Sequence, residues 1–373
     1  MSQTELNDLA DQIKLWAQEL GFQQAGISDT DLSTEEPRLA QWLEKGYHAD
    51  MNWIAEHGNK RSRPQELLPG TLRVISVRMD YLPADTQPIE VLKDASQAYI
   101  SRYTLGRDYH KLIRKRLAQL AKKIEAAAVN LSSVGEVKQR PFVDSAPVME
   151  RPLAQKAGLG WIGKHTLLLN SDAGSWFFLG EILTNIPLPM DSASQENQCG
   201  ECEACLKVCP TDAFPEPYTL DANRCISYLT IENKGAIAEE FREPIGNRIF
   251  GCDDCQAICP WNKYANFTNE TDFSPRHNLN NRDLLDLFNW TEAEFLSHTE
   301  GSAIRRTGFE GWQRNIAIGL GNADYSEAIV SKLESRLNDA SEMVAEHIEW
   351  AIQQQKLKQQ QPNKKRKRKI KNN

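Results

Sequence analysis

Apolar side chains recur every three to four positions in several stretches of this chain, which is the period of one face of an amphipathic helix. The clearest stretch covers residues 5–20, and Gly21 follows it where a helix cap is expected. A capping-box pattern at residues 33–36 predicts a second helix that ends near Gly46. Short apolar runs between such helices predict strands, at residues 24–27, 72–81, 166–170 and 176–184. This alternation through residues 22–185 predicts an α/β or α+β domain.

In the C-terminal third the pattern becomes helical. It predicts four helices, at residues 281–298, 303–320, 326–337 and 341–355. Thr291 and Glu294 form another capping-box pattern. Short helices with Ala-rich or Trp-rich faces favour an array of HEAT-like helical pairs. Arg305, Arg306 and Arg314 lie in this array, where they either contact a phosphate backbone or are solvated.

The chain has 373 residues, of which 40% are hydrophobic and 25% are charged, a composition typical of a globular protein with two or three domains. Its N-terminus has no basic segment followed by an apolar run, and no window approaches the roughly 18 apolar residues of a membrane span. We therefore expect a cytoplasmic protein, without membrane contact, that is a monomer. Residues 364–371 form a strongly basic tail. This tail suits a polyanionic partner about as well as it suits a disordered, solvated arm.

All eight cysteines lie between residues 199 and 260. Four are spaced x2, x2 and x3 and are followed by a proline: Cys199, Cys202, Cys205 and Cys209. Bacterial ferredoxins use this spacing to hold [4Fe–4S] clusters, with the fourth cysteine bound to a second cluster. In the other half, 26 residues separate the first cysteine from the rest: Cys225, Cys252, Cys255 and Cys259. No cysteine is left for a disulfide, as expected in a reducing compartment.

Ferredoxin pseudo-symmetry would give each cluster one ligand from the other half of the motif. The first cluster would be bound by Cys199, Cys202, Cys205 and Cys259. The second would be bound by Cys209, Cys225, Cys252 and Cys255. A pair of zinc sites is the alternative, because CxxC pairs also bind zinc. One tetrahedral zinc ion needs only two CxxC pairs, and the x2–x2–x3 run has one thiol too many for that arrangement. The spacing therefore favours iron–sulfur clusters.

The stretch 141–166 carries further candidate chemistry. Asp144 ends an apolar run, and burial there would raise its pKa and let it donate a proton near neutral pH. The structural alternative is an Asp that closes a strand into a turn. The glycines of Gly158-x-Gly160-x-x-Gly163 match the dinucleotide fingerprint, but a helix-like segment precedes them and a strand-like one follows. We expect these glycines to let the backbone approach a flat ligand closely instead.

Two polar segments before residue 141 can each be explained by a structural role or by a chemical one. The basic loop at residues 57–64 would either bind a phosphate or carboxylate or remain solvated. Asp108 precedes a helical pattern and is well placed as its N-cap, which needs no catalytic role. His110 follows it, and a lone histidine more often satisfies a local hydrogen bond than acts in catalysis.

Four sequence pieces, together with the double cysteine motif, resemble the epoxyqueuosine reductase family. They are GRDYH at 106–110, VDSAPVMERP at 143–152, GLGWIGKHT at 158–166 and CISYLTIE at 225–232. The resemblance covers roughly residues 5–355. It implies an α+β protein with an N-terminal α/β cobalamin-binding domain like that of reductive dehalogenases. A ferredoxin-like domain with two [4Fe–4S] clusters and a C-terminal α-helical HEAT-like domain would follow.

The same resemblance implies the activity and the roles of individual residues. Members of the family use cobalamin and two [4Fe–4S] clusters to remove the epoxide oxygen of epoxyqueuosine at the wobble position of tRNA, giving queuosine. Asp144 matches the family's proton donor. The residues in or near cobalamin-contacting segments are Arg61, Asp108, Asp144, Ser227, Cys252 and Asp253. Lys234 falls near tRNA contacts, to which we add Arg305 and Arg306, and an unidentified electron donor is implied.

We expect the domains to span residues 1–190, 191–265 and 266–355, with a disordered basic tail at 356–373. Two other functions fit parts of the chain. A reductive dehalogenase-like enzyme acting on a small molecule would usually carry a twin-arginine export signal, which the N-terminus lacks. A ferredoxin-type electron carrier would leave residues 141–166 unexplained. The basic tail favours a tRNA substrate, because cationic arms speed encounters with nucleic acid.

Overall fold

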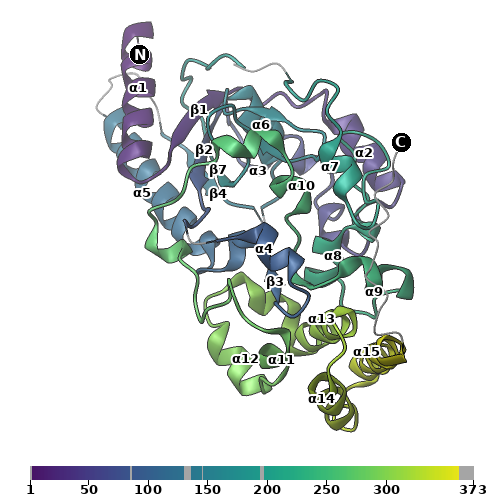
Figure 1. The fold of residues 1–373 in the computed structure, drawn as a ribbon. Coiled ribbons are helices and arrows are strands. Elements are labelled where there is room, and N and C mark those ends of the chain that lie inside the picture. The colour runs from purple at the N-terminus through teal and green to yellow at the C-terminus, as the bar shows by residue number, and fades with distance from the viewer. Residues whose placement is uncertain (1, 85, 130–135, 145, 194–196, 361–373) are drawn as a thin grey trace.

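A four-stranded antiparallel sheet forms the centre of the N-terminal half (Figure 1). The computed structural model describes residues 2–84, 86–129, 136–144, 146–193 and 197–360. In order across the sheet, the strands are β1 (Gln24–Ser28), β2 (Arg73–Asp80), β7 (Phe177–Thr184) and β4 (Gln139–Phe142). Strands β2 and β7 pair over their whole length and are buried almost throughout. Helices therefore have to cover both faces of the sheet.

Alternate side chains of β2 point to opposite faces of the sheet and enter different parts of the core. Val77 packs with the apolar faces of α1 (Gln3–Glu19) and α5 (Tyr109–Val129). Val74 on the other face packs in a separate cluster, to which α6 (Glu150–Lys156) contributes. The periodic apolar positions of the predicted first helix and the predicted strands are confirmed as these core positions.

The remaining elements of this half are short, namely α2 (Glu36–Glu44), α3 (Pro64–Leu67), α4 (Pro88–Lys93), β5 (Trp161–Ile162) and β6 (Leu168–Leu169). Helix α6 precedes the glycine-rich segment and β6 follows it, as predicted, whereas β5 lies within this segment and pairs with β6 in an antiparallel hairpin. Gly160 has φ +155°, and a Cβ there would meet the carbonyl oxygen of Leu169 at 1.9 Å. This glycine thus allows the backbone to approach another part of the chain, and our expectation of a flat ligand is not needed to explain it.

A second hydrophobic core lies at the C-terminal end of the molecule. It is built around the helices α11 (Leu284–Phe288), α12 (Glu292–His298), α13 (Gly308–Asn322), α14 (Glu327–Leu337) and α15 (Glu342–Gln360). Figure 1 shows these helices gathered at one end. Segments 98–105 and 222–250 also supply buried residues to this core, so it joins parts of the chain that are far apart in sequence. Among the helices of the described ranges, none is long and apolar enough to cross a membrane.

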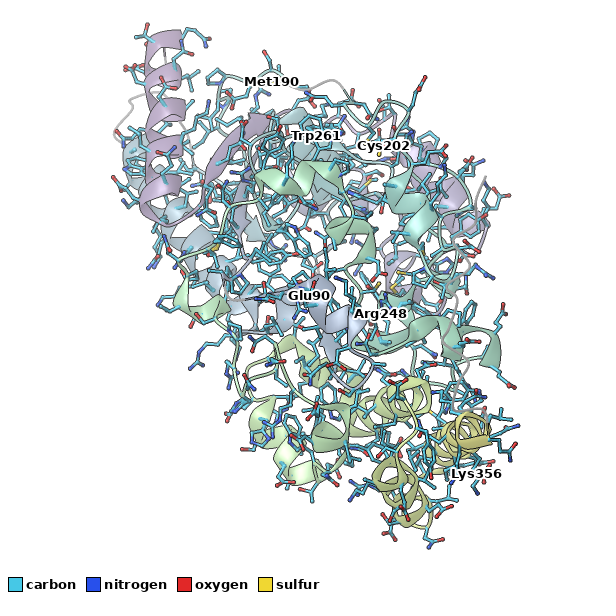
Figure 2. All side chains as sticks on the ribbon, in the orientation of Figure 1. Glu90, Met190, Cys202, Arg248, Trp261 and Lys356 are labelled. Atoms are coloured by element: carbon cyan, nitrogen blue, oxygen red, sulfur yellow. The ribbon has the colours of Figure 1, made fainter. Side chains whose placement is uncertain are left out.

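The cysteine-rich segment lies between these two cores. Its helices are α7 (Ala204–Val208), α8 (Ile226–Ile231), α9 (Glu239–Ile245) and α10 (Asp254–Ala257). Strand β8 (Arg248–Phe250) comes just before Cys252 and pairs in parallel with β3 (Tyr99–Ile100) from the N-terminal half. Arg248, labelled in Figure 2, donates to the buried Asp254 at 2.5 and 2.8 Å. This ion pair fixes β8 against the helix that carries Cys255.

The capping box predicted at residues 33–36 is wrong. Helix α2 starts at Glu36 after Glu35, whose side chain makes no capping hydrogen bond. The Glu36 carboxylate instead accepts hydrogen bonds from Ser62 at 2.6 Å and from Arg63 at 2.8 Å. One of the cations of the predicted basic loop is thereby paired with a carboxylate within the chain.

Two boundaries near the C-terminus also differ from the prediction. The single helix expected over residues 281–298 is divided into α11 and α12, because the capping box of Thr291 and Glu294 starts a new helix at Glu292. Residues 356–360, which we assigned to a disordered tail, continue α15. Lys358 of that turn donates to the carbonyl of Gly321 at 2.6 Å. The basic run at 364–371 lies outside the described residues.

Arg314 is fully buried, so neither phosphate contact nor solvation explains it. Its guanidinium donates to the carbonyls of Leu229, Asn233 and Gly235 at 2.8, 2.9 and 2.6 Å. An Arg314→Met variant would leave these acceptors unpaired, and we expect it to lower the free energy of unfolding by about 3 kcal/mol. Anaerobic urea unfolding of the loaded protein measures this. The exposed Arg305 is the control, and its replacement by Met should change stability by less than about 1 kcal/mol.

Candidate active site

A cavity of about 400 Å³ lies between the central sheet and the cysteine-rich segment. Aromatic side chains from the sheet half line part of it, namely Tyr81, Tyr103, Tyr109, Phe177 and Phe178. Thiols from the other half line another part, namely Cys209, Cys225, Cys252 and Cys255. These four are the cysteines that pseudo-symmetry assigned to the second cluster. The chain therefore gathers this set although up to 45 residues of sequence separate its members.

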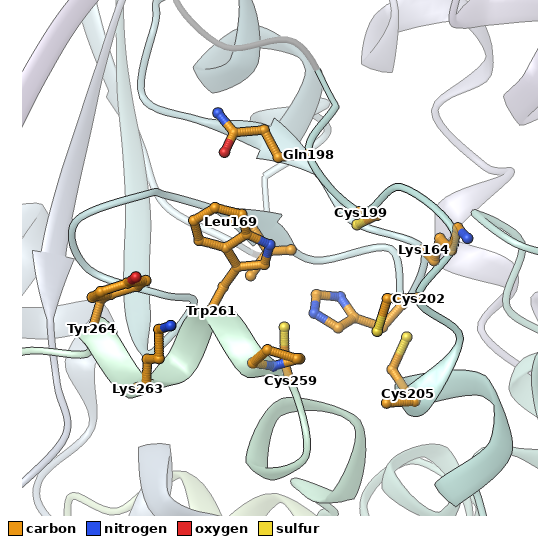
Figure 3. Close-up of a pocket in the computed structure, with 13 residues that line it drawn as sticks. Lys164, Leu169, Gln198, Cys199, Cys202, Cys205, Cys259, Trp261, Lys263 and Tyr264 are labelled. Carbon is orange, nitrogen blue, oxygen red and sulfur yellow. The ribbon is translucent and has the colours of Figure 1, made fainter.

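The other four cysteines line a separate cavity of about 220 Å³. Figure 3 shows Cys199, Cys202, Cys205 and Cys259 around this space, with Trp261 and Lys164 nearby. Cys259 comes from the second half of the motif, whereas the other three come from the first. The placement of the side chains thus agrees with the predicted exchange of one cysteine between the two halves of the motif. The assignment of each thiol to a cluster stays a prediction.

Asp144 closes β4 and carries its carboxylate to the large cavity. Its backbone is strained, with φ +43°, a conformation that few residues other than glycine adopt. The side chain is 50% exposed. The Tyr109 hydroxyl donates to its Oδ2 at 2.5 Å, and Nε2 of His110 lies 3.0 Å from the same atom. The other ring nitrogen of His110 lies 2.7 Å from a carboxylate oxygen of Asp108.

These contacts put the proton on His110 and not on Asp144 at neutral pH. Burial alone would lower the pKa of His110, but its hydrogen bonds to Asp108 and Asp144 raise it to about 9. Burial alone would raise the pKa of Asp144, but the hydrogen bonds from His110 and Tyr109 bring it below its ordinary value. Our expectation of a raised Asp144 pKa is therefore wrong. The sequence showed the apolar run before Asp144 but not the two donors that the fold brings to it.

The His110 ion pair predicts a pH-dependent stability. Its folded pKa is above the ordinary 6.5, so the pair stabilises fully below pH 6.5 and this contribution is lost as pH rises through about 9. The shift corresponds to roughly 3 kcal/mol, and we expect about 2 kcal/mol because solvent screens the half-exposed Asp144. The difference in unfolding free energy between the native protein and His110→Gln should shrink by this amount over that range. A difference that is constant with pH would contradict the pairing.

The cobalamin-contact residues that we predicted do not all reach the cavity. Asp144, Ser227, Cys252 and Asp253 line it, whereas Arg61 and Asp108 do not. Arg61 is buried, donates to the carbonyl of Ile54 at 3.0 Å and lies over the Trp53 ring. Asp108 accepts from the backbone of His110 at 3.0 Å and so caps α5, as predicted. Both residues are therefore placed to support the Asp144 site from outside the cavity.

Asp253 is buried, and burial raises its pKa. It accepts from Tyr99 Oη and from the backbone of Arg102, both at 2.8 Å. These donors come from the segment around β3, so Asp253 fixes the second cysteine motif to the N-terminal half.

Two of the three residues predicted to bind tRNA, Lys234 and Arg306, contact each other. Arg306 pairs with Glu232 at 2.7 Å, and Lys234 donates to the Arg306 carbonyl at 2.7 Å. The positive charge of Arg306 contributes to the lowered pKa of Asp144, so this cation lies close to the catalytic candidate. Arg305 is directed elsewhere and donates to the carbonyl of Leu296 at 2.7 Å.

Sequence reasoning missed a buried histidine between the two cavities. His165 is 2% exposed and contributes to the lining of both cavities. Burial lowers its pKa to about 4, so the ring is neutral. Its Nδ1 accepts from the backbone of Leu167 at 3.2 Å, and its Nε2 has no hydrogen-bond partner among the described residues. The one sequence signal for His165 is its position in the GLGWIGKHT segment, which resembles the epoxyqueuosine reductase family.

The comparisons with known proteins agree with these two sites. A family model described as epoxyqueuosine reductase QueG, DUF1730, matches residues 61–145, and one described as a 4Fe-4S double cluster binding domain matches residues 198–262. The epoxyqueuosine reductase of Salmonella typhimurium is 60% identical over 351 residues, which cover 94% of this chain and 89% of that protein. The chain belongs to the epoxyqueuosine reductase family.

Solved epoxyqueuosine reductases share the architecture. The enzyme from Streptococcus thermophilus has a TM-score of 0.80 at 28% identity, covering 92% of this chain and 89% of that one. An epoxyqueuosine reductase solved with an epoxyqueuosine-modified tRNA-Tyr stem loop has a TM-score of 0.78 at 26% identity, covering 94% and 99%. In this member of the epoxyqueuosine reductase family, the match at 198–262 includes all eight cysteines. It favours two [4Fe–4S] clusters over the zinc alternative.

Proposed function

We propose that this protein reduces epoxyqueuosine to queuosine at the wobble position of tRNA, with cobalamin and two [4Fe–4S] clusters as cofactors. One observation carries the proposal: Asp144, which is hydrogen-bonded to the protonated His110, lines the same cavity as the four thiols of the second cluster set. Removal of an epoxide oxygen as water consumes electrons and protons, and this cavity offers a source of each. The names of the relatives and the tRNA stem-loop complex of one of them supply the substrate.

The residues present fit the proposed cofactors. Each cavity presents four thiols, which is the ligand set of one [4Fe–4S] cluster. The large cavity is within the size range of ligand sites, and its aromatic walls suit the faces of a flat macrocycle. Ser227 and Thr166 add hydroxyl groups to the lining that can hydrogen-bond the amides at a corrin edge. Of the predicted contacts, Asp144, Ser227, Cys252 and Asp253 are those that we place against cobalamin.

Cobalamin, when bound, supplies electrons at low potential, and the clusters pass these electrons singly from an external donor that is not identified. The side chains of this protein handle the proton. Asp144 faces the cavity and is hydrogen-bonded to the His110 imidazolium. As negative charge develops on the departing oxygen, the Asp144 carboxylate takes a proton from His110 and passes it to that oxygen. Tyr109 holds the same carboxylate oxygen and fixes its direction.

The tRNA would reach the cavity beside Arg306 and Lys234, which lie near Asp144. Helix α15 packs on both α13 and α14, which supports the HEAT-like description of the C-terminal region that we propose. The domain limits at residues 190 and 265, the basic tail as a tRNA-binding arm, the monomeric state and the cytoplasmic location are parts of the same proposal.

An anaerobic assay tests this function. Reconstituted protein is incubated with cobalamin, a strong reductant and tRNA that carries epoxyqueuosine, and the digested nucleosides are weighed by mass spectrometry. We expect the modified nucleoside to lose the mass of one oxygen only when cobalamin is present. If the mass does not change although both clusters and cobalamin are bound, the proposal fails, and a corrinoid reductase of a small molecule becomes the better description.

A further inference from the structure

Two carboxyl groups behind Asp144 are not used by the mechanism above. Glu150, at the start of α6, lines the large cavity, and its Oε1 accepts from the backbone N–H of Asp144 at 2.6 Å. Glu181, in the middle of β7, is completely buried. Helix α6, which carries Glu150, packs on β7, which carries Glu181, and each of the two carboxyl groups affects the pKa of the other. Glu150 therefore links Asp144 at the cavity with Glu181 inside the core.

Glu181 must carry a proton in the folded protein. Neither of its oxygens accepts a hydrogen bond from a donor in the described parts of the chain. An ionised carboxylate without donors or a paired cation is very costly in a protein interior, so the group is neutral. Burial first, and then the charge of Glu150, raise the pKa of Glu181 well above its ordinary value. The Glu150 carboxylate is placed to accept this proton.

The surroundings of Glu150 and Glu181 allow the proton of Glu181 to move between them. Across the sheet, Glu181 lies opposite Ser76, which is also completely buried and whose hydroxyl has no partner among the described residues. Burial and the negative charge of Asp144 raise the pKa of Glu150 to about 7. The charged or titratable groups that interact with the pair are Arg61, Tyr109, Asp144 and Arg151. At neutral pH the pair thus holds between one and two protons, and it is poised to release one.

We infer that Glu150 and Glu181 form a proton store that supplies the second proton of the reaction. This inference rests on the proposed function. Conversion of an epoxide to an alkene breaks both carbon–oxygen bonds and consumes two electrons, which the reduced cofactors provide, and two protons, which leave with the oxygen as water. Asp144 and His110 provide the first proton. Glu150 delivers the second to the cavity, through Asp144 or directly, and takes its replacement from Glu181.

Amide substitutions test the store, because glutamine keeps the volume and the hydrogen bonding but has no proton to transfer. We expect Glu150→Gln and Glu181→Gln to reduce the turnover rate by roughly 10- to 100-fold, with unchanged KM for tRNA and unchanged iron and cobalamin content. The native rate should fall as pH rises through about 7, where Glu150 loses its proton. This fall should be absent in Glu150→Gln. The exposed Glu125 of α5 is the control, and its replacement by Gln should alter none of these values.

A second measurement separates this inference from the proposed function. Infrared spectra of the native protein should contain a protonated-carboxyl band that titrates near pH 7, and each amide variant should change it. This band does not require turnover, so an inactive native protein would contradict the function while the band still decides the inference. Variants with the native rate and pH profile would overturn the store. So would variants that are slower but keep both the pH profile and the infrared band, because their effect would then be structural only.

Discussion

An Asp144→Asn variant is expected to lose turnover by at least roughly 100-fold while it keeps its iron and cobalamin. The amide has nearly the shape of the carboxyl group and can still accept from Tyr109 at the cavity edge. It cannot take a proton from His110 or pass one to a departing oxygen. Single-turnover assays on pre-reduced protein measure the loss at the chemical step, before any effect of the electron donor.

Asp108→Asn is the matched control for this experiment. Asp108 holds the opposite nitrogen of the same imidazole but does not line the cavity. Its replacement should lower the pKa of His110 and shift the pH profile of turnover to lower pH, with a smaller loss of rate. Full activity of Asp144→Asn would remove Asp144 from the mechanism. Equal losses in both variants would indicate that the ion-pair network has a structural role only.

Pairs of cysteine substitutions are expected to show how the two clusters share their ligands. Cys199 and Cys259 line one cavity although they come from different halves of the motif. Serine at both positions should therefore remove one cluster and leave about half of the iron bound. Serine at Cys199 and Cys225 should damage both clusters and remove nearly all of the iron, because Cys225 lines the other cavity. Both double variants should have no turnover, since electrons need both clusters.

Iron analysis and electron paramagnetic resonance of the reduced proteins measure the outcome. If the clusters did not exchange ligands, Cys199→Ser with Cys259→Ser would affect two clusters, and the iron content would fall to nearly zero. This result would contradict the assignment. The comparison also tests Cys225, whose long separation from Cys252 made it the least regular member of the motif.

The sequence was informative wherever a local pattern decides the structure. The apolar period of α1, the mostly apolar stretches of β2 and β7, and the spacing of the cysteines all have a direct physical meaning that no distant contact overrides. The failures have a common cause, which is a contact with a residue that is distant in sequence. The capping box at residues 33–36 does not form because Arg63 and Ser62 bind the Glu36 carboxylate.

The same cause explains the error at the candidate active site. The pKa of Asp144 has the opposite direction from the predicted one because the start of α5 brings Tyr109 and His110 to it. Glu181 and His165 were not recognised either. An isolated Glu in an apolar strand or an isolated His in a turn does not reveal that the fold will bury it.

The parallel pairing of β3 with β8 limits how the cysteine-rich segment can be exchanged or removed. The strand before Cys252 has its pairing partner in residues 99–100, and Asp253 accepts hydrogen bonds from the same N-terminal segment. The cysteine-rich segment is therefore not a cassette that can be cut out, exchanged for another ferredoxin or expressed alone. Engineers who wish to change the electron supply will have to alter side chains around the clusters in place. In evolution, likewise, the two parts are expected to have been inherited together and not recombined.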